Sequence, residues 1–218
     1  MKLILKLLAT LLLLIVTITS MGYFFWYKPK FIPSENTLPF VYAVVQYKAA
    51  TLQRLIAKAN EIKEYSKDNH CNTKYCFMVD MQISSGKKRF FVYNLVKDSI
   101  EYAGLVAHGC GRNTQSNGIE FSNDANSLCS SLGKYKIGQS YSGKFGLAFK
   151  LYGLDATNSN AFNRFVVLHS LTCVPEEETY PLPICESWGC PTVAPALLKE
   201  LKKYIDRADK PILLDIYY

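Results

Sequence analysis

A histidine and a cysteine carry the strongest chemical signal in this sequence. His169 follows a short run of bulky apolar residues at 165–168, which predicts a buried strand that ends at the histidine. Cys190 comes twenty-one positions later, in the turn Ser187-Trp-Gly-Cys190, where Gly189 lets the backbone bend sharply. A thiol becomes a nucleophile as the thiolate, and a neighbouring histidine can take its proton. By spacing alone, two interpretations are equally well supported: a catalytic pair, or a core histidine and an unrelated structural cysteine.

The chain holds seven cysteines. An odd number in an exported protein indicates paired residues plus one free thiol, and with Cys190 free the other six allow fifteen pairings. The closest-spaced candidates are Cys173 with Cys185 and Cys71 with Cys76. The first of these pairs would close the loop between the histidine and the nucleophile.

Two other classes of ligand find little support in the sequence. A zinc site could use His70, Cys71 and Cys76, but the C-x4-C spacing has no second matching pair. The net charge is +7, yet the only basic triplet lies at 87–89 and no basic run is interleaved with aromatic residues. We therefore predict no metal, no cofactor and no nucleic-acid partner.

The elements that must position the pair are mostly strands. Apolar residues make up 49% of the chain, with fifteen tyrosines and twelve phenylalanines, which favours strands around a real core. The residues 110–139 are rich in Ser, Asn and Gly and predict one long loop, a feature that is usually functional inside a compact domain. The predicted fold class is mainly β (α+β). Strands are expected at 75–81, 89–95, 100–107, 144–152, 165–168 and 211–217.

Two helices are expected beside the strands. In residues 39–65, apolar side chains recur at helical spacing with polar residues between them, which predicts an amphipathic helix that packs on the domain. A second helix is expected over 196–207, where Leu197, Leu198 and Leu201 share one face. Because this helix begins shortly after Cys190, the dipole of its N-terminus should favour the thiolate.

The N-terminus predicts export. Lys2 and Lys6 precede an uncharged run at 7–27, long enough for a membrane helix and also typical of a signal peptide. We expect a signal anchor or signal peptide at 1–27, a linker at 28–38, the N-terminal helix at 39–70 and the catalytic domain at 71–218. The leader predicts a periplasmic or cell-envelope location, with the membrane as a partner through this segment.

Short motifs follow one another in a fixed order between residues 80 and 217. Each is weak alone, but the ordered set resembles the murein L,D-transpeptidase catalytic domain family, a branch of the YkuD-like L,D-transpeptidases. The motifs are Arg89-Phe-Phe-Val, Val106-Ala-His-Gly109, Phe121-Ser-Asn123, Ser130-Ser-Leu-Gly133, Tyr141-x-Gly-Lys-x-Gly146, Leu151-x-Gly-Leu154, Arg164 to His169, and Ser187-Trp-Gly-Cys-Pro191.

The cysteine turn departs from the pattern of the broader family. Trp188 stands where that family has a second histidine, and Pro191 and Thr192 stand where it has an apolar residue and an arginine. The narrower branch is similar to this chain in having Trp-Gly-Cys-Pro. The missing arginine leaves open how substrate would be held.

The resemblance implies an L,D-transpeptidase-like β-sandwich that acts on peptidoglycan stem peptides. Cys190 would attack the carbonyl between a diamino acid and the terminal D-residue, with His169 as the base that later protonates the leaving amine. Ser187 would shape the turn or polarise the Cys–His pair, and backbone N–H groups around Trp188 to Cys190, with Gly189 among them, would form the oxyanion hole. A second amine would then give a cross-link, whereas water would give hydrolysis.

Four residues are candidates for binding the substrate: Trp188, His108, Ser131 and Tyr141. His108 could line the cleft, or it could be a strand-end histidine that bonds to backbone. Ser131 could instead order its loop, because serine bonds readily to nearby backbone, and Tyr141 could belong to a solvated turn.

Other functions stay open at this point. An L,D-carboxypeptidase or other hydrolase of the same fold would use the same residues, and a non-catalytic cell-wall-binding protein could keep the fold alone. A sortase is disfavoured, because residues 191–199 contain no arginine and the histidine lies close to the cysteine.

Overall fold

The protein is described by a computed structural model that covers residues 2–27, 49–112 and 118–218. The chain divides into two compact units, Met1–Lys48 and Ala49–Tyr218. The linker predicted at 28–38 and the first part of the predicted helix, 39–48, lie outside the described residues.

The first unit holds the helix α1 (Lys2–Met21), which continues into the π-helix η1 (Gly22–Tyr27). The expected membrane segment falls on these two elements, and Lys2 and Lys6 both lie within α1. Among the described residues, no helix is both long and apolar enough to cross a membrane.

The second unit is built on one nine-stranded sheet with the order β3-β2-β1-β9-β5-β6-β7-β8-β4, curled into a nearly closed, barrel-like sandwich. The predicted mainly β class with a few helices is confirmed. The strands are β1 (Tyr75–Asp80), β2 (Phe90–Asn94), β3 (Ser99–Gly104), β4 (Val106–Ala107), β5 (Gly133–Gly143), β6 (Gly146–Gly153), β7 (Val167–Ser170), β8 (Thr192–Val193) and β9 (Leu213–Tyr217).

The central strands read as apolar runs because both of their faces are covered. Every residue of β2 and β9 is buried, as are five of the six in β1. In β1, Phe77 pairs antiparallel with Val92 of β2 and parallel with Leu214 of β9. Strands buried on both faces lose the alternation of apolar and polar residues, which is why these three are evident in the sequence.

Two predictions about the strands around the site are wrong. Residues 133–139 belong to β5 rather than to the long loop, since Tyr135 and Ile137 face the core and the backbone bonds to β6 and β9. The run at 165–168 is not a continuous strand. Phe165 adopts a left-handed backbone conformation with φ 58° and is 83% exposed, so the strand β7 begins only at Val167 and contains His169.

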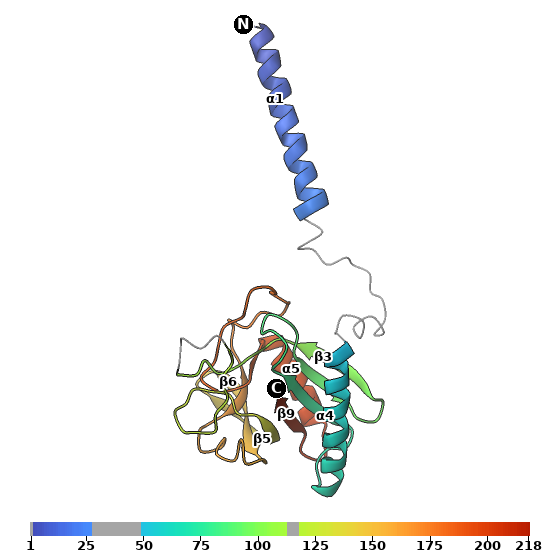
Figure 1. Cartoon of the computed structure of the whole chain (residues 1–218), viewed down its shortest axis with the longest axis vertical. Helices are drawn as coiled ribbons and strands as arrows, with labels where there is room; N and C mark the ends of the chain where they lie inside the picture. Colours follow the sequence, from blue (N-terminus) through green and yellow to red (C-terminus); the bar gives the residue numbers. More distant parts are fainter. Residues whose placement is uncertain (1, 28–48, 113–117) are drawn as a thin grey trace. The chain divides into compact units, whose positions relative to one another are not determined.

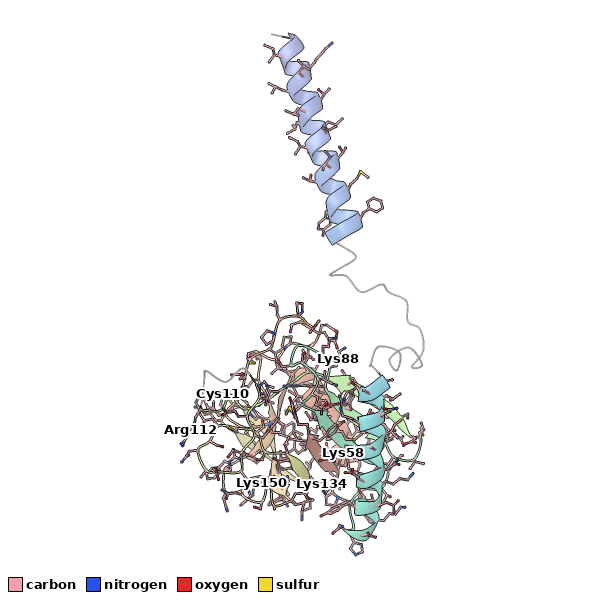
Figure 2. All side chains as sticks on the ribbon, in the orientation of Figure 1. Lys58, Lys88, Cys110, Arg112, Lys134 and Lys150 are labelled. Atoms are coloured by element: carbon pink, nitrogen blue, oxygen red, sulfur yellow. A yellow bond between two sulfur atoms is a disulfide. The ribbon has the colours of Figure 1, made fainter. Side chains whose placement is uncertain are left out.

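Two helices pack on this sheet, as Figure 1 shows for α4 (Ala49–Asp68) along one side of the domain. Leu55, Ala59 and Ile62 of α4 are buried, and Arg54 pairs with the fully buried Asp80 of β1 at 2.7 Å. The amphipathic pattern of the sequence therefore predicts the packing face of α4 correctly. The same helix carries Lys58, which is labelled in Figure 2. Its ammonium group lies 5.9 Å from the ring centre of Tyr217 on β9.

The second helix, α5 (Pro195–Asp206), confirms the helix predicted after the cysteine. Its face of Leu197, Leu198 and Leu201 is buried in the core. Proline at its first position suits a helix start, because the N–H that proline lacks would have no helical partner there.

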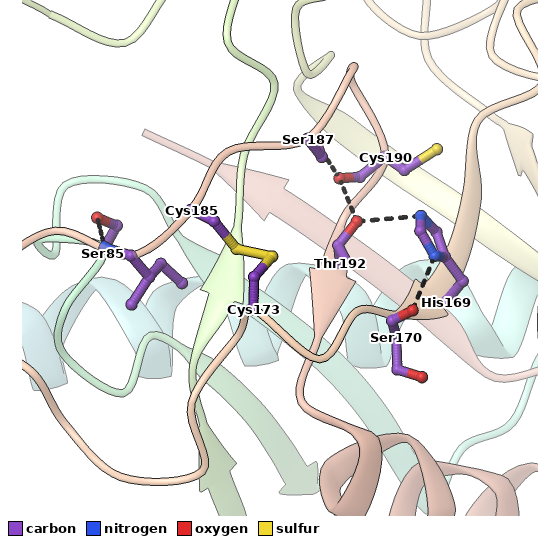
Figure 3. Close-up of a disulfide and its surroundings, with 9 residues drawn as sticks. Ser85, His169, Ser170, Cys173, Cys185, Ser187, Cys190 and Thr192 are labelled. Atoms are coloured by element: carbon purple, nitrogen blue, oxygen red, sulfur yellow. Dashed lines mark hydrogen bonds between the residues drawn. A yellow bond between two sulfur atoms is a disulfide. The ribbon is translucent and has the colours of Figure 1, made fainter. Parts of the chain in front are cut away.

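One of the two candidate disulfides is present. Cys173 and Cys185 are joined, with their Cα atoms 6.1 Å apart, and close the loop that leads from β7 to the cysteine turn (Figure 3). The candidate pair of Cys71 and Cys76 is not formed, because both are buried free thiols. The structure thus has five free cysteines rather than one.

Candidate active site

The sheet brings His169 and Cys190 to one place. His169 lies in β7, where it pairs with Ala148 of β6 on one side and with Thr192 of β8 on the other. Cys190 comes two residues before Thr192, so the parallel pairing of β7 with β8 carries the cysteine turn up to the histidine (Figure 3). Twenty residues lie between the two positions, which is enough for the crossover that two parallel strands require.

The imidazole of His169 is held in one orientation. Its Nδ1 lies 3.2 Å from the carbonyl oxygen of Ser170, and its Nε2 lies 3.1 Å from Oγ1 of Thr192. The ring of Phe145, from the β5–β6 turn, stacks on it at 5.2 Å between centroids. Because a carbonyl oxygen only accepts hydrogen bonds, Nδ1 carries the proton and Nε2 keeps its lone pair. Burial lowers the pKa of His169, so the neutral ring is the resting form.

The sulfur of Cys190 lies against backbone groups that lead into β7. The N–H of Val167 points at Sγ from 3.5 Å, and the carbonyl oxygen of Phe165 lies 3.8 Å away. Burial raises the pKa of Cys190, and this outweighs the N–H of Val167 and the charge of Arg164, which both lower the pKa. The resting site therefore holds a neutral thiol and a neutral imidazole. His169 must take the thiol proton at the moment when the sulfur of Cys190 attacks.

The thiolate that the helix dipole is expected to favour is not the resting form, because burial raises the pKa of Cys190. The helix α5 begins at Pro195, and the strand β8 separates it from Cys190 along the chain.

The turn that carries Cys190 is fixed by Ser187 and Gly189. Oγ of Ser187 donates to the carbonyl oxygen of Cys190 at 2.6 Å and accepts the N–H of Gly189 at 3.2 Å. Gly189 has φ 111°, and a Cβ there would lie only 2.8 Å from the carbonyl oxygen of Cys129. Glycine is required at this position both by the backbone conformation and by the close approach of residue 129.

A cleft of about 610 Å³ opens over the pair. The side chain of Trp188 is 76% exposed at this cleft, and that of Phe145 is 51% exposed. A large exposed tryptophan next to a nucleophile can serve as a contact surface for a bound molecule. Residues that line the cleft include Lys144, Phe145, Phe165, His169, Trp188 and Cys190.

Of the predicted site residues, the structure gathers Cys190, His169, Ser187 and Trp188 in the lining of this cleft, with Gly189 in the turn between them. His108, Ser131 and Tyr141 are not among the described residues that line it. Tyr141 is exposed on β5, and Oγ of Ser131 accepts a bond from Arg164 at 2.7 Å.

His108 lies behind the cysteine turn, on a buried arginine. NH2 of Arg89, which is fully buried, lies 2.9 Å from Nδ1 of His108. Arg89 also bonds to the carbonyl oxygens of Val106 and Ile83, so it ties the start of β2 to β4. Burial, together with the charge of Arg89, lowers the pKa of His108 to about 4, and its ring is neutral at pH 7.

We expect His108→Asn to flatten the dependence of unfolding on pH below pH 6.5. In the folded chain the pKa falls from 6.5 to about 4, so between these values the unfolded chain binds a proton that the folded chain does not. The free energy of unfolding therefore decreases as pH falls through this window, by at most about 3 kcal/mol. Asparagine can still accept from Arg89 but does not titrate.

The measurement is urea unfolding of both proteins at pH 7 and at pH 4.5. Burial raises the pKa of Asp215 to about 6, which has the opposite effect on stability in this window, but Asp215 is present in both proteins and cancels in the difference. Equal slopes for the two proteins would contradict the assignment of His108.

Arg164 connects the segment 122–131 to the strand that carries the histidine. Its guanidinium donates to the carbonyl oxygens of Ser122 at 2.8 Å and Cys129 at 2.6 Å. It also donates to the hydroxyl groups of Ser131 at 2.7 Å and Ser127 at 3.2 Å. The backbone of Gly189 packs against the carbonyl group of Cys129. Arg164 therefore fixes the segment against which the cysteine turn packs.

The sequence did not predict three residues of this site: Thr192, Phe145 and Arg164. Thr192 was expected only as the replacement of an arginine, and Phe145 only as part of a strand. Arg164 stands at the head of the histidine run, and its charge before an apolar stretch was the one available signal for a structural anchor.

A comparison with models of known protein families finds one match that includes both Cys190 and His169. The family described as "L,D-transpeptidase catalytic domain" matches residues 46–213. No curated protein sequence matches the chain.

Similar solved structures are distant. The helical cell shape determining protein Pgp2 from Campylobacter jejuni is 12% identical, with a TM-score of 0.43 over 65% of this chain and 46% of that one. An L,D-transpeptidase from Xylanimonas cellulosilytica is 11% identical, with a TM-score of 0.37 over 66% and 60%. An L,D-transpeptidase from Mycobacterium smegmatis is 10% identical, with a TM-score of 0.38 over 66% and 59%. This chain thus spans less than two thirds of the length of each.

Proposed function

Because the chain belongs to the L,D-transpeptidase catalytic domain family, we propose that it is a cysteine-dependent L,D-transpeptidase that acts on peptidoglycan stem peptides. The observation that carries the proposal is the shared cleft of Cys190 and His169, in which Nε2 of a neutral imidazole holds a lone pair. A general base in this form can take a proton at neutral pH without first losing one.

The reaction would run through an acyl-enzyme. His169 takes the thiol proton as the sulfur of Cys190 attacks the carbonyl carbon between the diamino acid and the terminal D-residue. The C–N bond then breaks, the leaving amine receives the proton from His169, and a thioester remains. An acceptor amine then attacks the thioester and gives a proton to His169. The C–S bond breaks, and the departing thiolate takes that proton back from His169, which restores the thiol.

The developing oxyanion needs backbone donors in the cysteine turn. The N–H of Gly189 already bonds to Ser187, so the donors that we propose are the N–H groups of Trp188 and Cys190. Each donor of this kind is worth roughly 2.7–4 kcal/mol in the transition state. The bond from Ser187 to the carbonyl oxygen of Cys190 keeps this turn in one conformation.

A disaccharide tetrapeptide with a D-amino acid as acceptor tests the proposal. We expect the wild type to release the terminal D-residue and to form the exchanged peptide, with a thioester on Cys190 visible in the intact mass. Cys190→Ala should do neither. Cys110→Ser is the matched control, because Cys110 is also a partly exposed free thiol but does not line the cleft.

The same assay separates the other functions. Release of the D-residue without exchange would show a carboxypeptidase that uses the same residues. Binding of the muropeptide without any product, equal in the wild type and Cys190→Ala, would show a wall-binding protein and end the enzymatic proposal. Since peptidoglycan lies outside the cytoplasm, we also propose that the domain works in the periplasm or cell envelope.

A further inference from the structure

A single hydroxyl group lies between the base and the main chain of the nucleophile. Oγ1 of Thr192 is 3.1 Å from Nε2 of His169 and 3.3 Å from the carbonyl oxygen of Cys190 (Figure 3). Thr192 is fully buried and His169 is only 4% exposed. The position of Thr192 is fixed by β8, which pairs with β7 on one side and with β4 on the other.

While His169 is neutral, only one direction is possible for the hydrogen bond between Thr192 and His169. Nδ1 of His169 carries the proton, because Ser170 offers it only an acceptor, and Nε2 therefore has a lone pair. The hydroxyl of Thr192 must then be the donor to Nε2. This bond stabilises the neutral imidazole and occupies the lone pair that the thiol proton needs.

Once His169 is protonated, both ring nitrogens become donors. In this buried place the N–H at Nε2 needs an acceptor, and the oxygen of Thr192 can accept at the same 3.1 Å if its own proton turns away. The carbonyl oxygen of Cys190 offers the second position for that proton. It accepts one bond from Ser187, and a carbonyl oxygen has two lone pairs.

We propose that Thr192 is a positioning residue whose hydroxyl turns between His169 and the carbonyl group of Cys190 and so partners the base in both protonation states. When the hydroxyl donates to the carbonyl oxygen, the lone pair of Nε2 is free and the S–H proton of Cys190 can move to it. The S–H bond breaks, an N–H bond forms, and Thr192 keeps its own proton throughout. The proposal rests on the proposed function, since it assumes Cys190 as nucleophile and His169 as base.

The test is the rate at which iodoacetamide alkylates Cys190, measured over a range of pH by peptide mass spectrometry. Thr192→Val keeps the shape and the strand preference but removes the hydroxyl, and Thr192→Ser keeps the hydroxyl. At neutral pH the thiolate forms by transfer to His169, so we expect the rate in Thr192→Val to fall roughly 10- to 100-fold. At alkaline pH the thiol loses its proton to solvent and the imidazole stays neutral, so the rates should converge. Thr192→Ser should follow the wild type.

Several outcomes would overturn the proposal. One is a Thr192→Val variant that is alkylated as fast as the wild type at neutral pH. Another is a variant whose alkylation rate is lowered equally at every pH, because such a loss would indicate a purely structural role. Should Thr192→Val fail to fold, Thr192→Ala removes the same hydroxyl without filling the site and is read by the same profile. A wild type whose profile matches that of His169→Asn would instead refute the proposed function, because the histidine would then not act on the thiol.

Discussion

Replacing His169 by asparagine is expected to lower the rate of acyl transfer from a stem tetrapeptide roughly 10²- to 10⁴-fold, the usual contribution of a general base. The amide of asparagine can take the place of Nδ1 and donate to the carbonyl oxygen of Ser170, so the local packing is largely kept. Nothing in the new side chain reaches the position of Nε2. The thiol of Cys190, whose pKa burial raises, would then lack a base when the nucleophile attacks.

The measurement is the release of the terminal D-residue under saturating and limiting substrate, which separates kcat from KM. We expect the loss in kcat, with thermal unfolding close to that of the wild type. His70→Asn is the matched control, since His70 is exposed and its left-handed backbone, φ 52°, is one that asparagine tolerates. Activity of His169→Asn within a few fold of the wild type would show that another group is the base.

The sequence predicts the parts of the fold in which local pattern and burial agree. The strands at 75–80, 90–94 and 213–217 are almost entirely buried and are mostly apolar in sequence. β5 was missed because its Ser and Gly residues are typical of loops, whereas its backbone is bonded on both sides by β6 and β9. Bonds between strands that are distant in sequence decide this element, and no local propensity reports them.

The candidate site divides in the same way. Cys190 and His169 are recognisable because their chemistry is rare, and Gly189 because only glycine suits so sharp a turn. Thr192 is not recognisable, since its role depends on a parallel pairing of β7 with β8 that places it beside the imidazole. The state of the thiol was also misjudged, because burial, which raises the pKa of Cys190, is a property of the folded chain.

Arg164→Lys is expected to destabilise the domain by about 3 kcal/mol and to lower the reactivity of Cys190, although the charge is kept. Lysine carries a single ammonium group, so it cannot reach the four acceptors that the planar guanidinium spans on residues 122–131. The carbonyl groups left without a donor in this half-buried place each cost stability. The segment would then shift away from the cysteine turn that it supports through Cys129.

Arg112→Lys is the matched control, because Arg112 lies in the same loop and its Nε donates an exposed bond to the carbonyl oxygen of Asn126 at 2.7 Å. Its free energy of unfolding should change by no more than about 0.5 kcal/mol. Urea unfolding and the rate of alkylation of Cys190 at neutral pH measure the two effects. If Arg164→Lys were as stable as Arg112→Lys, the positive charge at residue 164 would be sufficient for stability, and the four guanidinium bonds would not be needed. A stable Arg164→Lys with a slow thiol would instead show that the guanidinium acts on the cysteine turn without holding the loop.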